Sequence, residues 1–396
     1  MNCPDFLRCR RVRNSLALIA IALAACGGGV ETGGTGTGAY VQGPISGFGS
    51  VIVAGVRFDD AAASIDDRDG IVRSRDDLRL GMLVEVESGP IASDASGARS
   101  ATATRVRLAS ELLGPISSLD VANARLTVLG QPVRLTAATV VEGIAGGASS
   151  LALGDVVQVH GFFAPATGYL ATRLERRSSA PGGYRLRGAV LDIDLAARTL
   201  RVGAQRFDLA AVGVPAGLVN GDFVRMTLQT AQVGGRWPVS AIAIDNRSAG
   251  DRDEAELEGL ISGFTCASRF SVNGVRIDAS SAAFVDGSAG LAEGVRVKVR
   301  GRSVEGSLVA SSVDIRNDDE AFGDGIDLRD AIASVNPAAQ TFTLRGVTVF
   351  YGSQPAPRFD GGSASDLAPG RRVRVRGVVG ADRTRVIATR IEFVSS

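Results

Sequence analysis

The sequence is poor in the residue types that most enzyme active sites and metal sites use. Its 396 residues include one histidine, His160, and one lysine, Lys298. A Ser-His-Asp triad would have to use His160. Of the four cysteines, three lie within the first 26 residues, in the predicted signal peptide and lipidation site, so His160 and Cys266 alone are too few for an ordinary zinc site. Aromatic residues make up only 5% of the chain, whereas proteins that bind single-stranded nucleic acid stack bases on aromatic side chains. We therefore expect a protein that is not an enzyme and has no cofactor, metal or nucleic acid partner.

The sequence has an apolar run at its N-terminus, residues 16–25, which follows four arginines. The run is too short to span a bilayer and ends in Leu-Ala-Ala-Cys, which resembles the lipobox of bacterial lipoproteins. The resemblance implies cleavage after residue 25 and lipidation of Cys26; the alternative is an ordinary secretory signal with an incidental cysteine. Gly27 stands where an aspartate would resemble an inner-membrane retention signal. We therefore expect a lipid anchor in the outer membrane, with the chain facing the periplasm or the cell surface.

The chain has few cysteines and a net charge close to zero. Cys3 and Cys9 would leave with the signal peptide and Cys26 would carry lipid, so Cys266 would have no partner in the mature chain. We expect no intramolecular disulfide. The formal net charge of +1 gives no global signature of polyanion binding.

Glycine is abundant, with 50 residues, and five of them lead a repeated segment. The copies read LRLGMLVEVES, LALGDVVQVHG, LVNGDFVRMTL, LAEGVRVKVRG and LAPGRRVRVRG, with anchor glycines Gly81, Gly154, Gly221, Gly294 and Gly370. A valine stands three residues after each glycine and an apolar residue five after it, while the residue between them is polar and varies in charge. This period of two predicts a strand with its valine face on a core and its other face in water. Lys298 lies on that outer face, and His160 is expected in a variable, solvent-facing position.

Each anchor strand belongs to a unit of about five short strands, which favours a small Greek-key barrel of the OB type. The anchor glycines lie 67 to 76 residues apart. We predict an all-β tandem array of five OB-like barrels. The predicted segments are a signal peptide at residues 1–25, a glycine-rich tether at 26–40, and β repeats at 41–112, 113–180, 184–248, 256–317 and 326–396. The sequence leaves open whether the repeats form a rigid rod or a flexible string.

The repeats resemble a known bacterial family. The pattern ISGFGSVIVAGVRFD, LRLGMLVEVES and ATRVRLA, followed by GPISSLD, LTVLGQPVRL, LALGDVVQVHG and ATRLE, is similar to the DUF5666 repeat of secreted proteins and lipoproteins. The resemblance covers the first two repeats well and the last two recognisably, and the third departs most. Because the family has no assigned function, the resemblance implies fold and location only.

Two groups of residues are candidates for binding a ligand. Arg374 and Arg376 are expected on the same outer side of one strand, where Arg390 could join them. Such a strip suits lipid A phosphates or acidic glycans, or is simply a solvated sheet face. Trp237 and Tyr169 could stack on sugar rings or, alternatively, cap the barrel ends. The stretch from Asp66 to Asp77 partly matches a calcium loop, but Ile65 occupies the first ligand position, so a solvated loop is the alternative.

These observations favour a non-enzymatic, lipid-anchored envelope protein that serves as a structural or interaction module. The alternative is an OB-type binding protein for glycans or other polyanions. In either case the membrane is reached through the N-terminal lipid, and an envelope protein or a glycan is the expected partner. The oligomeric state is left open.

Overall fold

The computed structural model describes residues 38–109, 112–144, 146–245, 249–320, 322 and 325–394. The predicted signal peptide, Cys26 and most of the predicted tether lie outside the described residues. Within them the fold is all-β apart from short 3-10 segments, as predicted. No helix in this part of the chain has the length and apolar character needed to cross a membrane.

The strands fall into five consecutive sets, called barrels 1 to 5. Barrel 1 contains β1 (Ala39–Phe48), β2 (Val51–Val53), β3 (Val56–Asp59), β4 (Ser64–Asp67), β5 (Leu83–Ser88), β6 (Ala92–Ser93) and β7 (Arg99–Leu108). Barrel 2 contains β8 (Leu112–Asp120), β9 (Arg125–Val128), β10 (Gln131–Glu142), β11 (Val156–Ala164) and β12 (Gly168–Arg176). Barrel 3 contains β13 (Tyr184–Asp194), β14 (Thr199–Val202), β15 (Gln205–Asp208), β16 (Phe223–Leu228) and β17 (Trp237–Ile244).

The remaining two sets complete the chain. Barrel 4 contains β18 (Arg252–Cys266), β19 (Arg269–Val272), β20 (Val275–Asp278), β21 (Ala283–Phe284), β22 (Arg296–Val304) and β23 (Ser307–Ile315). Barrel 5 contains β24 (Ile326–Ala331), β25 (Ser334–Asn336), β26 (Thr341–Leu344), β27 (Val347–Phe350), β28 (Arg358–Asp360), β29 (Arg372–Val379) and β30 (Arg385–Phe393). The 3-10 segments η1 (Arg75–Asp77), η2 (Gly147–Ser150) and η3 (Ala364–Asp366) precede the anchor strands of barrels 1, 2 and 5.

Barrel 2 shows how each unit closes. Strands β8, β9 and β10 form an antiparallel meander, and β10 pairs in parallel with β12. Strand β11 then pairs with both β12 and β8. The first strand thus neighbours the second and the fourth, which removes the open edges that five loose strands would present. The prediction of OB-like, five-stranded barrels in a tandem array is confirmed.

The anchor glycines explain why the repeated segment organises each barrel. All five have φ between +79° and +95°, a left-handed conformation that glycine adopts without strain. Their N–H groups donate at 2.7–2.9 Å to carbonyl groups in the first strand or, in barrel 5, directly after it: those of Ile45, Ile116, Val190, Ile261 and Ile332. The anchor turn is therefore tied to the first strand of its own barrel. The valines that follow are fully buried, as the alternation predicts: Val84, Val157, Val224, Val297 and Val373.

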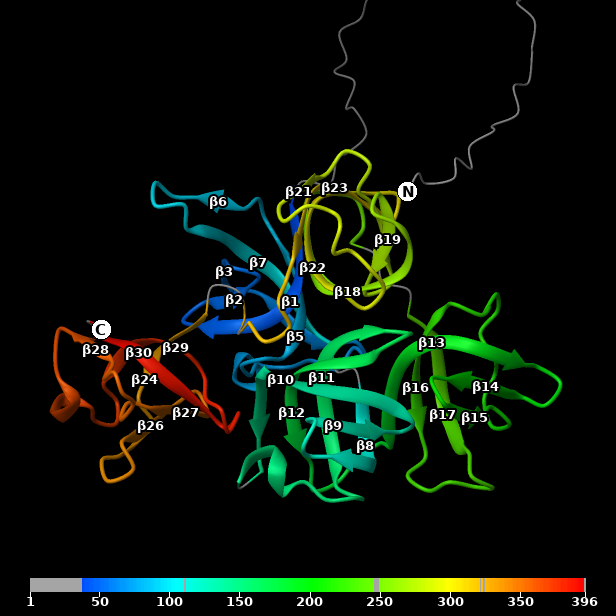
Figure 1. Cartoon of the computed structure of the whole chain (residues 1–396), viewed down its shortest axis with the longest axis horizontal. Helices are drawn as coiled ribbons and strands as arrows, with labels where there is room; N and C mark the ends of the chain where they lie inside the picture. The colour runs from blue at the N-terminus through cyan, green and yellow to red at the C-terminus, as the bar shows by residue number, and fades with distance from the viewer. Residues whose placement is uncertain are drawn as a thin grey trace, which may run out of the picture.

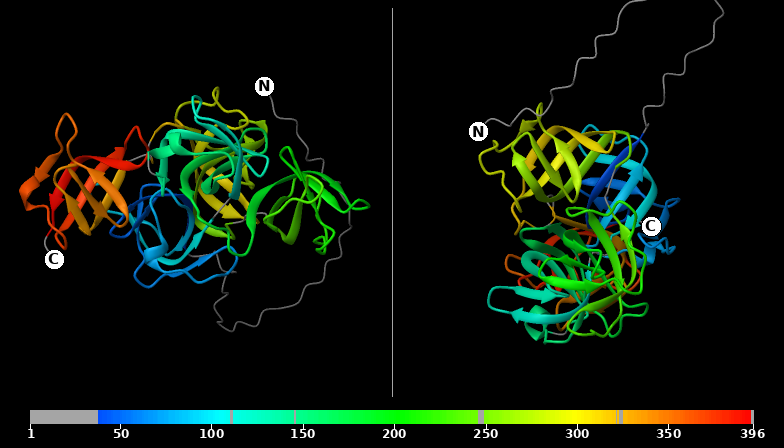
Figure 2. Two further views of the ribbon diagram at one scale, coloured as in Figure 1. Left: turned by 90° about the horizontal axis from the view of Figure 1, so that it is seen from below. Right: turned by 90° about the vertical axis from the view of Figure 1, so that its right-hand side faces the viewer.

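The five barrels form a cluster in which barrel 1 contacts barrels distant in sequence (Figures 1 and 2). Residues 39–42 of β1 pair in parallel with residues 254–257 of β18, and residues 47–48 pair in parallel with 327–328 of β24. Strands of barrels 1, 4 and 5 consequently form one hydrogen-bonded network, and those of barrels 2 and 3 form another. The arrangement is neither a linear rod nor a loose string.

This pairing also corrects two predicted boundaries. Strand β1 begins at Ala39, within the predicted tether, and β18 begins at Arg252, within a segment expected to link repeats 3 and 4. The two segments pair with each other, and each also pairs within its own barrel: residues 39–42 with 85–88 of β5, and residues 252–257 with 299–303 of β22. Pairing on both sides satisfies the backbone hydrogen-bonding groups of these segments.

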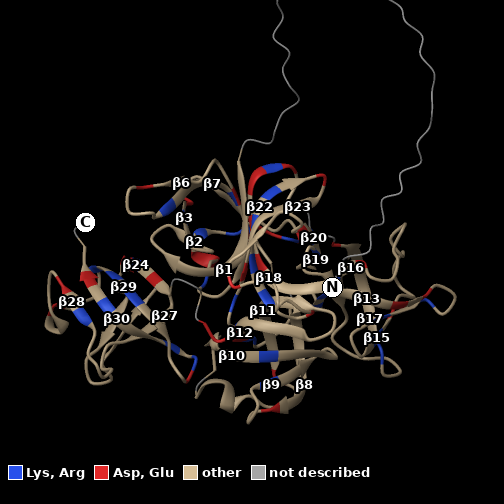
Figure 3. Cartoon of the chain, turned by 45° about the horizontal axis from the view of Figure 1, so that its top comes forward, with Lys and Arg blue, Asp and Glu red and all other residues tan. Residues whose placement is uncertain are grey.

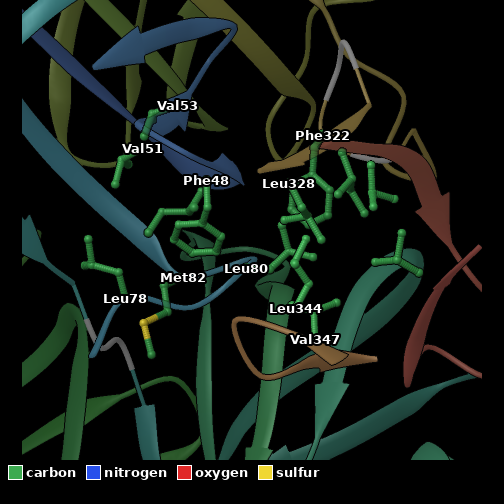
Figure 4. Packing of buried hydrophobic residues seen from close by; sticks show 14 of the residues in the cluster. Phe48, Val51, Val53, Leu78, Leu80, Met82, Phe322, Leu328, Leu344 and Val347 are labelled. Atoms are coloured by element: carbon green, nitrogen blue, oxygen red, sulfur yellow. The ribbon is translucent and has the colours of Figure 1, made fainter. Parts of the chain in front are cut away.

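Barrels 1 and 5 share one hydrophobic core. Phe48, Leu78 and Leu80 of barrel 1 belong to the same cluster as Leu328 and Leu344 of barrel 5, and all five side chains are almost completely buried (Figure 4). Arg345 of barrel 5 also lies over the Phe48 ring, with its guanidinium carbon 4.6 Å from the ring centroid. A barrel this small buries limited apolar surface alone, so the shared core adds stability that an isolated repeat would lack.

Some side chains on the outer face of the anchor strands are buried. This corrects the prediction, made from the alternation of polar and apolar residues, that the whole outer face is in water. Glu85 is 4% exposed and pairs with Arg68. The side chain of Lys298 is 12% exposed, and its Nζ lies 2.7 Å from Glu256 Oε1 and donates at 2.7 Å to the carbonyl of Ala54 in barrel 1. Glu85 is covered by a loop of its own barrel and Lys298 by a neighbouring barrel, and periodicity within one strand can reveal neither.

The expectation of a lone thiol at Cys266 is wrong for the chain described by the structure, in which Cys266 is disulfide-bonded. The expectation referred to the cleaved and lipidated chain, whereas the chain described here has all 396 residues. Cys3, Cys9 and Cys26 all lie outside the described residues.

Candidate anion-binding face on barrel 5

Barrel 5 carries arginines on the outer face of its sheet. The strand register places Arg376 of β29 opposite Arg390 of β30, and Arg374 opposite Arg329 of β24. Alternate residues of β29 point inward and are fully buried, so the arginines between them point outward. Arg57 of β3 reaches the same place from barrel 1. We call these five residues the arginine face.

One carboxylate lies at the centre of the arginine face. Asp327 of β24 accepts hydrogen bonds from Nε and Nη2 of Arg374 at 2.9 and 2.6 Å. It also lies 3.2 Å from Arg57 Nη2 and 3.9 Å from Arg376 Nε. Because three guanidinium groups share one carboxylate, the positive charge exceeds the negative charge around Asp327.

The outer edge of the face is paired separately. Arg390 donates to Asp360 of β28 at 2.5 Å, and Arg358 donates to the same carboxylate at 2.8 Å. Arg376 has only the long contact with Asp327, and its side chain is 51% exposed. Arg329 is exposed and has no ion pair with a described residue, so Arg329 and Arg376 are the two members of the face with the weakest internal pairing. Figure 3 shows basic positions on the neighbouring strands β29 and β30.

At the arginine face, the pKa values of Arg374 and Arg57 are shifted in opposite directions. Hydrogen bonding to Asp327 raises the pKa of Arg374. Burial lowers the pKa of Arg57; Asp327 opposes this, and the charges of Arg374, Arg329 and Arg376 lower it further. Like charges disfavour one another at this distance, so an additional anion would stabilise the charged forms of all of them.

The structure therefore brings together Arg374, Arg376 and Arg390, the three arginines singled out from the sequence. Their role in binding a ligand stays a prediction. Sequence reasoning missed Arg57 and Arg329. Arg329 lies on the first strand of barrel 5 and Arg57 on a different barrel, so only the sheet order and the docking of barrel 1 on barrel 5 bring them to this face.

Tyr169 and Trp237 are not available as platforms for sugar rings, which corrects their selection as candidate binding residues. Tyr169 is 1% exposed, its hydroxyl donates to the carbonyl of Arg187, and its ring lies 4.8 Å from that of Phe163. Trp237 is 8% exposed and meets Tyr184 edge to face at 5.3 Å. Both rings belong to the core shared by barrels 2 and 3, where their apolar area is buried.

His160 is buried at the contact between barrels 1 and 2, whereas the sequence predicts a surface position. Its Nδ1 lies 3.1 Å from the carbonyl oxygen of Ala109, and its Nε2 lies 3.4 Å from Gln158 Nε2. Burial, with a smaller effect from the charge of Arg173, lowers the pKa of His160 to about 4. The ring is neutral at pH 7, and a neutral ring that meets a carbonyl through Nδ1 carries its proton there. It can therefore accept a hydrogen bond from Gln158 through Nε2.

The carboxylates between Asp66 and Asp77 face arginines and backbone N–H groups. Asp67 accepts from Arg73 at 2.7 Å and from the N–H groups of Asp69 and Ile71 at 3.0 Å. Burial of Asp67 acts to raise its pKa, but these hydrogen bonds outweigh burial and hold the pKa below its ordinary value. Asp66 pairs with Arg105. Within the part of the chain that the structure describes, no cluster of acidic, histidine or cysteine side chains is suited to hold a metal.

A polar cavity of about 340 Å³ lies where barrels 1, 2 and 3 meet, and His160 lines it. Six arginines and four carboxylates also line it, but many of these charges pair with one another. Asp69, for example, lies 3.0 Å from Arg225 and 3.7 Å from Arg185. These ion pairs join barrels 1 and 3 across the cavity.

The comparison with protein families follows the barrel pattern. Residues 114–175, 258–314 and 331–392 match the family described as "Domain of unknown function (DUF5666)". The chain carries DUF5666 domains. They coincide with barrels 2, 4 and 5, so barrel 1 is not matched although its sequence resembles the family. Barrel 1 departs from the others by a first hairpin three residues shorter than that of barrel 4 and by the added strand β6.

Comparisons with individual proteins add little. No curated protein matches the chain. Among solved structures, "drosophila Unr CSD456" is 14% identical, and the match covers 72% of this chain and 98% of that one with a TM-score of 0.14.

Proposed function

We propose that this DUF5666 protein is a non-enzymatic envelope protein, anchored in the outer membrane through lipid on Cys26, that binds a polyanionic envelope component. The observation that carries the binding role is the arginine face, where three guanidinium groups share Asp327 and Arg376 is half exposed. The arrangement of the barrels supports an interaction module, since strand pairing between barrels holds this face in a defined geometry.

The surroundings of the two residues best suited to act as bases support a non-enzymatic role. His160 is buried and neutral, and its two ring nitrogens meet Ala109 and Gln158. Lys298 is paired with Glu256 between barrels 1 and 4. A general base must reach the proton that it abstracts from a bound substrate, and neither side chain is placed to do so.

The partner class follows from the chemistry of the face. A row of partly exposed guanidinium groups recognises carboxylate, sulfate or phosphate groups presented at intervals, as on an acidic polysaccharide. Exposed aromatic side chains for stacking bases are lacking among the residues of the face, so nucleic acid is the less suitable polyanion. Binding is driven by charge and should weaken as salt screens it.

The binding role is tested with the detergent-solubilised full chain and polygalacturonate as the probe. We expect saturable binding that weakens at least about tenfold between 50 and 300 mM salt, because the contacts are partly exposed ion pairs. Arg376→Ala combined with Arg390→Ala should reduce binding by a similar factor, while Arg206→Ala with Arg236→Ala on barrel 3 serves as the matched control. Binding that is unaffected by salt and by the barrel 5 variants, or equally strong binding of neutral dextran, would disprove the proposal.

The anchor is tested independently by metabolic labelling with a fatty-acid probe in a Gram-negative host. We expect label on the chain that disappears with Cys26→Ala, because the acylated atoms belong to that residue. Cys266→Ala should keep the label. Equal labelling of the Cys26→Ala variant would rule out the lipid anchor without affecting the binding test.

A further inference from the structure

A second open site lies between barrels 3 and 4, away from the arginine face. It is a cleft of about 870 Å³, to which Pro165 of barrel 2 also contributes. Its floor is apolar and includes Val190 and Phe223 of barrel 3. Among the described residues, Arg276 of β20 is its only charged lining residue, and none of the described carboxylates lines it. A ligand of this cleft therefore meets one positive charge beside an apolar surface.

The barrel 4 wall of the cleft presents a row of hydroxyl groups beside that charge. The strand register aligns Ser262 of β18 with Ser271 of β19, and Ser271 with Arg276; all three line the cleft. Arg276 is aligned in turn with Ser307 of β23, which follows the lining residue Gly306. The residues that alternate with them, such as Val272 and Leu308, are fully buried, so this row lies on the outer face of the barrel. Asn220 faces it from barrel 3.

Arg276 differs from its counterpart in barrel 1. The segments VAGVRFD and VNGVRID align Arg57 with Arg276. Arg57 pairs with Asp327 of barrel 5 at 3.2 Å. Arg276 is exposed and forms no ion pair with any residue that the structure describes. Arg57 thus binds a carboxylate of the neighbouring barrel, whereas the aligned Arg276 is free to bind the carboxylate of a ligand.

An extended peptide does not suit this position. In barrel 1 the segment Ile-Ser-Gly-Phe pairs with β24, and Gly47 lies opposite Asp327. In barrel 4 the same segment uses the N–H of Phe264 to bond Glu293 Oε2 at 2.9 Å, and Gly263 has φ +60°. The backbone donor that a docking strand would need is already occupied, so recognition in the cleft has to come from side chains and from the ends of turns.

Two further observations favour a ligand with hydroxyl groups. The Ser262 hydroxyl is buried and has no hydrogen-bond partner among the described residues. A buried hydroxyl without a partner costs free energy that a rotation toward a bound hydroxyl would recover. In addition, a Cβ built on Gly221 or Gly263 meets no atom within 4 Å, so the cleft stays wide where these residues line it.

We infer that the cleft between barrels 3 and 4 binds a carboxylate-bearing sugar, one or two residues long, with the carboxylate on Arg276 and the hydroxyl groups on the serine row. Serine hydroxyls and the Asn220 amide match a polyhydroxylated ligand, and Arg276 supplies the matching charge. The volume lies in the range of small-molecule sites. The inference is independent of the arginine face, which lies on barrel 5.

The test uses the full chain and a galacturonate disaccharide, with the methyl ester of the same disaccharide as the neutral probe. Calorimetry measures the affinity for each. We expect saturable binding of the acid and at least about tenfold weaker binding of the ester, since a charge-assisted hydrogen bond to the guanidinium is lost. Arg276→Gln should weaken binding of the acid by a similar factor and leave binding of the ester unchanged.

The matched control is Arg302→Gln. Arg302 is also an exposed arginine of barrel 4 without an ion pair to a described residue, but it lines a different cavity. This control, and the arginine-face variant Arg376→Ala with Arg390→Ala, should bind the disaccharide as the unaltered chain does. A failed polygalacturonate test would thus leave this result interpretable.

Amide chemical shifts give a readout that does not depend on a variant. Titration with the disaccharide should move the signals of Ser271, Gly274 and Asn220. The inference is overturned by acid and ester of equal affinity, by an unchanged affinity in Arg276→Gln, by shifts confined to other barrels, or by no saturable binding of the acid at millimolar concentration.

Discussion

Barrels 1 and 4 share the segment Ile-Ser-Gly-Phe and an aligned arginine, yet their outer faces have different surroundings. Beside barrel 1, the strand β24 covers Gly47 and Asp327 pairs with Arg57. Beside barrel 4, the space around Gly263 is open and Arg276 points into a cleft. The same local sequence therefore builds an interface between barrels in one place and an open wall in the other.

This difference shows how a repeat protein can divide tasks among similar units. The covered face contributes to the assembly of the barrels, and the buried strand pairing leaves little freedom to change it. The open face is not constrained by a neighbour, so its side chains can be used for recognition. Four predictions test the comparison, in order of decreasing expected effect.

The largest effect should come from adding one methyl group at the covered face. In Gly47→Ala the new Cβ would lie 2.1 Å from the Asp327 carbonyl oxygen and 2.8 Å from a methyl group of Ile52, so β24 must move away. We expect a loss of about 3 kcal/mol in the free energy of unfolding, measured with denaturant. Gly263→Ala meets no atom within 4 Å but has a left-handed φ, and should lose only about 1 kcal/mol. Equal losses would contradict the comparison.

A second effect concerns pH and the covered contact between barrels 1 and 2. The folded pKa of His160 is about 4, below the value of about 6.5 in an unfolded chain. The unfolded state therefore binds the proton first, and stability falls as the pH decreases from above 6.5 toward 4. Linkage predicts a loss of about 2 kcal/mol between pH 8 and pH 5.

The control for this prediction is His160→Gln, which keeps a polar side chain without the titration. Its free energy of unfolding should change by about 2 kcal/mol less over the same pH interval. Identical pH profiles for the two proteins would show that His160 is not held neutral in the folded chain.

A third, smaller effect should follow from removing the charge at the centre of the arginine face. Asp327→Asn leaves Arg57 and Arg374 without their shared carboxylate, and the site is partly exposed, so we expect a loss of about 1 kcal/mol. The loss should shrink in high salt. Polygalacturonate should bind this variant more tightly, because the internal competitor is gone; weaker binding would contradict the proposed role of the face.

The smallest effect should be on stability in Arg276→Gln. The side chain is exposed and has no ion pair with a described residue, so the free energy of unfolding should change by less than about 0.5 kcal/mol. Arg57→Gln, at the aligned position in barrel 1, should lose about 1 kcal/mol because Asp327 loses a partner. Thermal unfolding of both variants measures the contrast, and a similar loss in both would mean that Arg276 also has a structural partner.

Most of the fold could be predicted from the sequence, because its signals are local. The inward valines beside Gly81 or Gly370 repeat with a period of two, and burial of such residues needs only the strand's own barrel. The candidate site could be predicted in part. Arg374 and Arg376 share one strand, so alternation places them on one side, and Arg390 follows from the adjacent strand.

The errors have a common cause. His160, Tyr169 and Trp237 were assigned exposed or end positions from their places in single repeats, but each is buried against a neighbouring barrel or within a core that two barrels share. Lys298 is similar: its strand predicts an outward direction correctly, while barrel 1 supplies the carbonyl that it meets. Alternation reports the direction of a side chain and carries no information about what lies beyond it.

The amino-acid sequence by itself therefore determined the number of barrels, their closed all-β form and the inward residues, since these depend on periodicity and on glycines at tight turns. Only the tertiary structure decided which outer faces are covered. That outcome depends on pairing between strands more than 200 residues apart, such as β1 with β18, and on the burial of charges between barrels. Whether a barrel face is open or covered depends on how the barrels are assembled. The arginine face and the cleft differ from similar surfaces on other barrels because they remain open to solvent.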